Sequence, residues 1–234
     1  MSELPKSPDY LKSAEELFTP DPRSHLVGRI ESGGFRKTTI DDHHSDVAQF
    51  ELCRVVPEGI RIHFETAKNL YLYAWLAYRF YPVAEHHALA SLELGLRERF
   101  KLGIPKKYWS IAGREPTLKP LLRYAIDINM IQNQGFRRWH ERVLARAKHR
   151  YDQECLNELI ERNLDQIELD YNQVAPNDDD REWDYLPILL EVLPEIRNSY
   201  AHGSTMLHNQ VLGTLELVCE ILNQLFDGDT CSDL

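Results

Sequence analysis

The sequence lacks the features of secreted and membrane proteins. No apolar run approaches the roughly 20 residues that a membrane helix needs. The N-terminal residues, MSELPKSPDY, are of mixed charge and do not form the apolar stretch of a secretory signal. The four cysteines, at positions 53, 155, 219 and 231, are widely scattered and form no CxxC pair, which argues against a disulfide framework or a zinc site. We therefore expect a cytoplasmic protein that does not interact with a membrane.

Short motifs that mark common catalytic sites are also missing. The sequence has no glycine-rich phosphate loop, no GxSxG turn and no HExxH pair. The one cluster with metal-ligand chemistry is DDHH at residues 41–44, which lies in a predicted loop without a second cluster of ligands. We therefore expect no metal and no other cofactor.

The composition is that of a folded protein. Apolar residues make up 43% of the 234 residues and aromatic residues 10%, which suits one sizeable domain or two small ones. The net charge of −10 counts against a nucleic-acid partner. Its distribution is uneven, however, because residues 97–150 contain 14 Lys and Arg against 4 Asp and Glu, whereas residues 151–234 contain 3 against 19. The middle third could present a cationic face to a polyanion. Alternatively, basic and acidic helices pair within the fold or across a dimer.

Helical periodicity dominates from about residue 64 onwards. Pro82, Gly103 and Pro105 predict helix ends, because proline cannot donate the next helical hydrogen bond and glycine favours a helix stop. The predicted helical segments are 64–81, 83–103, 121–131, 135–172, 185–203 and 208–226. Together they predict an all-α, antiparallel helical bundle.

The first part of the chain has a different pattern. Residues 48–65 alternate apolar and polar side chains around Pro57-Glu58-Gly59, which predicts a short hairpin. The predicted organisation is an N-terminal extended arm or cap at residues 1–59, a helical domain at 60–226 and a flexible tail at 227–234.

The segment RNSYAHG, residues 197–203, is the sharpest candidate for chemistry. Arg197 ends a strongly apolar helical stretch, where a charge is costly unless it has a partner or a purpose. Gly203 predicts a helix stop directly after His202. The plain interpretation is that His202 caps helical carbonyls and that Arg197 pairs with a nearby acid, Glu195 or Asp184.

Helical geometry limits how these side chains can meet. Asn198 and His202 are four residues apart and share one helix face, whereas Arg197 is rotated about 140° from His202. Arg197 and His202 therefore converge only if the helix is distorted, if the arginine wraps around it, or if a second copy completes the site across a two-fold axis.

The string RNSYAHG, which ends one apolar helix and precedes another, resembles the signature of the HEPN superfamily (higher eukaryotes and prokaryotes nucleotide-binding domain). That signature is an arginine, four to six residues and a histidine, often with a polar residue directly after the arginine. Residues 64–100, FETAKNLYLYAWLAYRFYPVAEHHALASLELGLRERF, also resemble the first helix pair of bacterial HEPN proteins. The resemblance covers residues 60–226 and leaves out the N-terminal arm.

The resemblance implies a metal-independent endoribonuclease that cleaves single-stranded RNA, often as a toxin or phage-defence effector. By position, Arg197 and His202 would be the catalytic pair and Asn198 a polar support. Histidine can move the proton of the attacking 2′-OH near neutral pH, and a guanidinium can stabilise the phosphorane oxygens. The implied partners are a second copy of the chain, single-stranded RNA and an antitoxin protein. Some family toxins carry a tyrosine two residues after the histidine, which an antitoxin modifies, but this chain has Ser204 there.

Two further groups of residues have a structural and a functional interpretation. Glu93 either forms an i,i+4 pair with Arg97, or orients Arg197 or the same arginine of a partner copy, as acids on this helix can in the family. The basic run either follows an RNA backbone or forms a solvated helix face, and its leading members are Arg137, Arg138, Arg142 and Arg146. The alternative function is a HEPN-like module without catalysis, which binds RNA, a nucleotide or a protein. A purely structural helical scaffold is the third hypothesis.

Overall fold

The computed structural model describes residues 7, 9–31, 33–109, 115–201 and 207–227, and most of them are helical. The prediction of a mostly helical chain is confirmed, and the sole sheet in the described residues is an antiparallel pair of strands, β1 Gly28–Glu31 and β2 Gly34–Lys37. The α-helices are α1 Ile40–Ala48, α2 Glu58–Tyr73, α3 Phe80–Arg99, α4 Leu118–Asp127, α5 Arg137–Glu161, α6 Asp178–Arg181, α7 Leu186–Ala201 and α8 Leu212–Phe226. Short 3₁₀ turns are η1 Pro22–Leu26, η2 Lys106–Tyr108, η3 Asn133–Gly135 and η4 Tyr171–Gln173.

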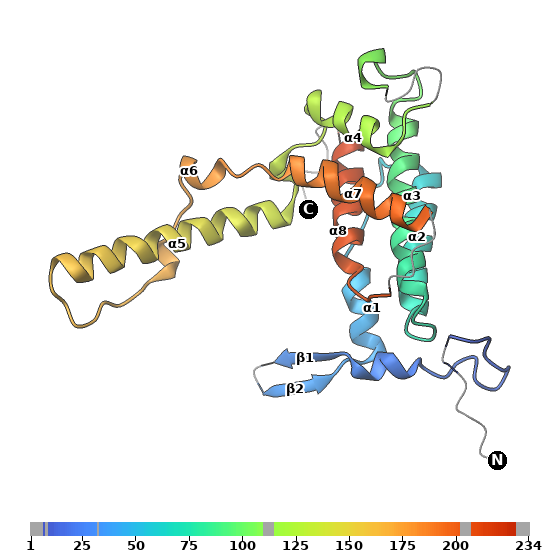
Figure 1. Cartoon of the computed structure of the whole chain (residues 1–234), viewed down its shortest axis with the longest axis horizontal. Helices are drawn as coiled ribbons and strands as arrows, with labels where there is room; N and C mark the ends of the chain where they lie inside the picture. Colours follow the sequence, from blue (N-terminus) through green and yellow to red (C-terminus); the bar gives the residue numbers. More distant parts are fainter. Residues whose placement is uncertain (1–6, 8, 32, 110–114, 202–206, 228–234) are drawn as a thin grey trace.

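The body of the molecule is built on α2, α3 and α8 (Figure 1). α2 and α3 are antiparallel, because Tyr71 packs on Tyr81 near their connection and His63 stacks on His87 farther from it. α8 lies beside α3, while α7 crosses α3 and also packs on α4 (Figure 1). None of the helices in the described ranges is both long and apolar enough to span a bilayer.

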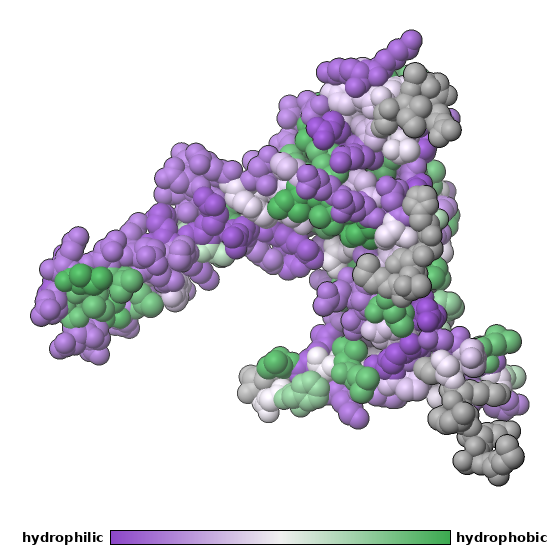
Figure 2. Space-filling view, viewed as in Figure 1, coloured by the Kyte–Doolittle hydropathy of each residue, from purple (hydrophilic) through white to green (hydrophobic). Residues whose placement is uncertain are grey.

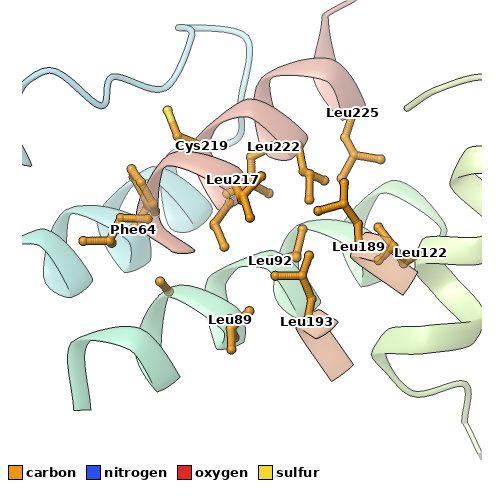
Figure 3. Close-up of a cluster of buried hydrophobic side chains, with 14 of the residues drawn as sticks. Phe64, Leu89, Leu92, Leu122, Leu189, Leu193, Leu217, Cys219, Leu222 and Leu225 are labelled. Carbon is orange, nitrogen blue, oxygen red and sulfur yellow. The ribbon is translucent and has the colours of Figure 1, made fainter. Parts of the chain in front are cut away.

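The core lies where α2, α3, α4, α7 and α8 meet (Figure 3). Phe64 of α2, Leu92 of α3 and Leu193 of α7 are fully buried. Burying each such side chain contributes about 1.5–3 kcal/mol. α8 is buried around nearly its whole circumference, so it is the central helix of the body.

The helices α3 and α8 approach each other at Gly95. A Cβ at this position would lie 2.3 Å from Cδ2 of Leu222, a side chain that is fully buried and has little room to move. The glycine is therefore needed for the close contact between the two helices.

We predict that Gly95→Ala destabilises the protein. Overpacking costs about 1–3 kcal/mol and should outweigh the gain of about 1 kcal/mol in helix propensity. The measurement is the free energy of unfolding in urea. The matched control is Gly59→Ala in α2, where an added Cβ would meet no atom within 4 Å and stability should stay equal or rise. Equal stability of the Gly95→Ala variant and the wild type would contradict the packing described here.

The hairpin predicted at residues 48–65 is wrong. α2 begins at Glu58, directly after Pro57, so the Pro-Glu-Gly turn signal marks the start of a helix. The residues that α2 buries, Ile60, Phe64, Ala67 and Tyr71, follow helical spacing. The boundary predicted between residues 59 and 60 therefore falls within the first turn of this helix.

The strands form instead at residues 28–37, inside the predicted arm. Gly34 has a φ of 116°, which few residues other than glycine adopt, and it follows the turn that joins the strands. Ile30 and Phe35 are cross-strand partners and remain exposed.

Pro82 does not end a helix, contrary to the prediction. It lies in the first turn of α3, where its missing N–H would have no helical partner in any case. The break lies at residues 74–79, between α2 and α3. One or two long helices are predicted at residues 135–172, and the structure has one, α5, which ends at Glu161; two residues later, Asn163 takes a left-handed conformation with φ of 50°.

The helix α1 holds a buried histidine against the body. His43 is 3% exposed and stacks on Tyr71 with ring centroids 4.2 Å apart. Its Nε2 lies 2.8 Å from the carbonyl oxygen of Tyr71, so Nε2 carries the proton that is donated. Burial lowers the pKa of His43.

We predict that His43 makes stability depend on pH. A neutral imidazole is favoured in the folded state, so its contribution is complete above the unfolded-state pKa of about 6.5 and is lost as the pH falls through the lower folded-state pKa. Urea unfolding at a series of pH values from neutral to mildly acidic should show this loss. The variant His43→Asn should be less stable at neutral pH and show a shallower dependence. If the free energy of unfolding depends on pH equally in His43→Asn and the wild type, His43 is not the source of the dependence.

The helix α5 projects from the body as an arm, which we define as residues 137–181 (Figure 1). The chain returns along α5 after Glu161, and Tyr171 donates a hydrogen bond to Asp152 at 2.8 Å. Figure 2 shows a polar surface along the arm with an apolar patch at its far end. Exposed apolar side chains near the end of α5 are Leu156 and Ile160.

Candidate functional site

The helix α7 brings Arg197 against a carboxylate of α3. Both Nε and Nη2 of Arg197 lie 3.1 Å from Oε2 of Glu93. The other oxygen of Glu93 accepts a hydrogen bond from Arg97 at 2.9 Å, and Arg97 contacts Glu115 at 2.8 Å. The four side chains form an alternating row of charges, with Glu93 between two guanidinium groups.

Glu93 and Arg197 are the more buried members of this row, whereas the side chain of Glu115 is 85% exposed. The side chain of Glu93 is 12% exposed and that of Arg197 is 33% exposed, so Glu93 contacts the guanidinium on its buried side and Arg197 still reaches solvent. Both predicted contacts of Glu93, with Arg97 and with Arg197, are present together. The acid that contacts Arg197 is Glu93, rather than the Glu195 or Asp184 of the plain interpretation.

The remaining residues of the motif are placed only in part. Asn198 is exposed on α7, which stays helical up to Ala201. His202 and Ser204 lie outside the described residues. Of the predicted catalytic pair, the structure therefore describes Arg197 and its contact with Glu93.

A second polar cluster surrounds Glu85, which is only 2% exposed. Tyr200 of α7 donates a hydrogen bond to its Oε2 at 2.5 Å, and Thr214 of α8 donates one to its Oε1 at 2.5 Å. Nε2 of His208 lies 3.1 Å from the hydroxyl oxygen of Tyr200 and 3.5 Å from Glu85. Burial raises the pKa of Tyr200, and the adjacent Glu85 carboxylate raises it further.

The protons in this cluster can be assigned from its donors. The hydroxyl proton of Tyr200 points to Glu85, so the Tyr200 oxygen accepts and Nε2 of His208 donates. Tyr200 and His208 flank residues 202–206 in the chain, and both converge on one buried carboxylate. Glu85 thus connects the two ends of the segment that carries His202.

Sequence reasoning missed this cluster, although a signal was available. Glu85 falls in the same helical stripe as Tyr81, Ala88, Leu89 and Leu92, which are all buried. A carboxylate in an apolar stripe needs hydrogen-bond donors, and these come from α7 and α8, more than 100 positions away in the chain. The stripe could therefore have identified the acid, but not its donors.

We predict that Tyr200→Phe destabilises the fold. The substitution removes a donor from a buried carboxylate, which should cost about 1–3 kcal/mol in the free energy of unfolding. The matched control is Tyr73→Phe, since Tyr73 is 54% exposed and its change should stay within about 0.5 kcal/mol. Urea unfolding of both variants measures the difference. Indistinguishable free energies for the two variants would argue against a stabilising role of the Glu85 cluster.

The basic residues predicted to bind RNA lie on the first half of α5 and are partly neutralised. Arg137 lies 2.5 Å from Glu216 of α8, and Arg138 contacts the same carboxylate at 3.3 Å. Arg146 donates to the backbone carbonyl of Asp179 at 2.9 Å. Arg142 is exposed. This pattern matches the alternative in which basic and acidic helices pair within the fold.

The DDHH cluster does not form a metal site in this structure. It lies in α1, where Asp42 caps the helix start with Thr39 and pairs with Arg36, while His43 turns into the body. Across the described ranges, no group of three or more His, Cys, Asp and Glu side chains could hold a metal ion.

Comparisons with protein-family models, with curated proteins and with solved structures found no match for this chain. Its function is therefore inferred from its own side chains and from the resemblance of its motif.

Proposed function

We propose that the chain is a HEPN-like, metal-independent endoribonuclease that cleaves single-stranded RNA by attack of the RNA 2′-OH. The observation that carries the proposal is the Arg197–Glu93 contact. Glu93 contacts the Nε and Nη2 side of the guanidinium at 3.1 Å, which fixes the plane of the group. A guanidinium group has five N–H donors. Those on Nη1 can therefore bind a phosphate while Nε and Nη2 still contact Glu93.

The reaction assigned to these residues is a transesterification. The 2′-oxygen bonds to phosphorus as its proton leaves, and the bond from phosphorus to the 5′-oxygen breaks as that oxygen gains a proton. His202 would move a proton, because imidazole titrates near neutral pH. Arg197 would stabilise the charge on the phosphorane oxygens. The products are a 2′,3′-cyclic phosphate and a free 5′-hydroxyl.

A homodimer is part of this proposal. Side chains five residues apart on a helix diverge by about 140°, so a second copy is a direct route to an arginine and a histidine in one groove. The proposed setting is the cytoplasm, with the enzyme acting as a toxin or phage-defence effector and with an antitoxin protein as its partner.

The second candidate is a HEPN-like module that binds RNA, a nucleotide or a protein without catalysis. The pairing of Arg137 with Glu216 within the chain favours it, because this arginine of α5 is already neutralised. An RNA phosphate at this end of α5 would compete with Glu216 for the guanidinium.

We predict that the purified protein cuts unstructured RNA in the presence of EDTA and leaves cyclic phosphate ends. Arg197→Ala should lower the turnover rate by about 100-fold or more, because it removes the positive charge that stabilises the phosphorane oxygens in the transition state. His202→Ala should lower it by a similar factor. Labelled RNA resolved on denaturing gels measures both rates. The matched control is Arg162→Ala at the end of α5, where the arginine is 69% exposed and pairs with Glu158.

Other outcomes separate the hypotheses. RNA binding without cutting would favour the non-catalytic module, and neither binding nor dimerisation would favour a structural scaffold. Growth on expression gives a second readout, since the active enzyme should be toxic and the His202→Ala form harmless. Cutting that persists in both variants would refute the assigned catalytic pair.

A further inference from the structure

A pocket of about 310 Å³ lies between the N-terminal part of the chain and the body. Its volume is at the lower end of the range of small-molecule sites, about 300–1,000 Å³. β1 and α1 line one side of it, the end of α2 and the start of α3 line the other, and Leu212 at the start of α8 completes the lining. The pocket shares no lining residue with the Arg197–Glu93 contact.

Four aromatic rings are gathered at this pocket. His43 of α1 stacks on Tyr71 of α2. Trp75 and Tyr81 lie 5.6 and 5.9 Å from the His43 ring, measured between ring centroids. All four side chains are buried and line the pocket. Tyrosine and tryptophan rings attract cations as well as apolar groups, so the rings suit a ligand of either kind.

The hydroxyl groups of Tyr71 and Tyr81 lack a partner at the pocket. Tyr71 is 4% exposed and Tyr81 is 3% exposed, yet neither hydroxyl forms a hydrogen bond with another described residue. Neither oxygen is among the unpaired polar atoms that are sealed from solvent, so each hydroxyl keeps some accessible surface. The hydroxyl of a buried tyrosine usually has a partner. Two without one beside the same pocket indicate that a polar group binds there.

The charge at the pocket comes from Asp46 and Arg29. Arg29 donates a hydrogen bond to Oδ2 of Asp46, while Oδ1 accepts none from the part of the chain that the structure describes. Burial raises the pKa of Tyr71 and of Tyr81, and the negative charge of Asp46 raises both further. At Tyr71, Arg29 opposes Asp46 with the smaller effect. The carboxylate therefore favours a positive group near the two hydroxyls.

A carboxylate oxygen, two hydroxyl oxygens and aromatic rings together suit an ammonium group. We propose that the pocket binds a small primary amine in its charged form. The N–H groups of the ammonium donate to Oδ1 of Asp46 and to the hydroxyl oxygens of Tyr71 and Tyr81. The alkyl chain packs on the aromatic rings. This binding does not depend on the proposed cleavage, because it concerns another site.

The test is isothermal titration of the full chain with three ligands of similar size, which are butylammonium, butanol and butyrate. Butylammonium should bind about 10-fold or more tightly than the other two, because butanol lacks the charge and butyrate carries the opposite one. Tetramethylammonium should also bind more weakly, since it has no N–H to donate. No saturable binding of butylammonium at tens of millimolar, or equal affinity of any of the other three ligands, would overturn the proposal.

Variants of the pocket locate the binding. Asp46→Asn should weaken the binding of butylammonium about 10-fold, and Tyr81→Phe, which keeps the ring, about 3-fold or more. The matched controls are Asp41→Asn on the exposed side of α1 and Tyr73→Phe on α2, which should both bind as the wild type does. Wild-type affinity in both pocket variants would contradict the proposal. Urea unfolding checks that the variants fold, and Tyr81→Phe leaves the Arg29–Asp46 pair intact.

The same head group occurs in free amines and in lysine side chains. Titration with lysine blocked as its Nα-acetyl amide separates these sources, because its side chain has as many carbons as butylammonium. Tighter binding than that of butylammonium would assign the pocket to a lysine of a protein partner, and weaker binding would assign it to free amines. No RNA is present in these titrations, so failure of the nuclease proposal would leave their result intact.

Discussion

The burial of α8 is the constraint on which the rest of the structure depends. Nine of its residues are buried, and among them are Thr214 and Glu216 as well as leucines and isoleucine. A buried carboxylate needs a partner, and Glu216 of α8 contacts both Arg137 and Arg138. These contacts join the first turn of α5 to α8, at the point where α5 leaves the body. Thr214 meets Glu85 in the same way and joins α8 to α3. The polar residues of the central helix thus determine where its neighbours attach.

The two carboxylates of α3 give α7 its position near the motif. Arg197 contacts Glu93, and Tyr200 contacts Glu85, so the last turns of α7 are tied to α3 by two polar contacts. Polar contacts of this kind are directional, whereas apolar packing is not. They therefore fix the rotation of α7 about its axis, and with it the direction in which the guanidinium points. The proposed chemistry depends on that direction.

The sequence predicted the helical class and most helices of the body, because glycine, proline and 3.6-residue periodicity mark them. It failed at Pro57, which directly precedes α2, and at Pro82, which lies in the first turn of α3. Proline is compatible with the start of a helix as well as with its end, and local sequence does not distinguish the two. The contact of Glu93 with Arg97 could be predicted from their i,i+4 spacing, whereas its contact with Arg197 was suggested only by the family resemblance. The donors of the Glu85 cluster could not be predicted, because Thr214 and Tyr200 come from distant segments.

The support of α5 at one end has a mechanical consequence. Its 25 residues span about 37 Å, so a bend of about 10° near Trp139 would displace the far end by about 6 Å. Trp139 and Val143 hold the near end of α5 in the core, whereas farther out the helix contacts the returning chain, as Tyr171 contacts Asp152. A force applied at the outer end would therefore act on the contacts around Trp139 through the whole length of the helix.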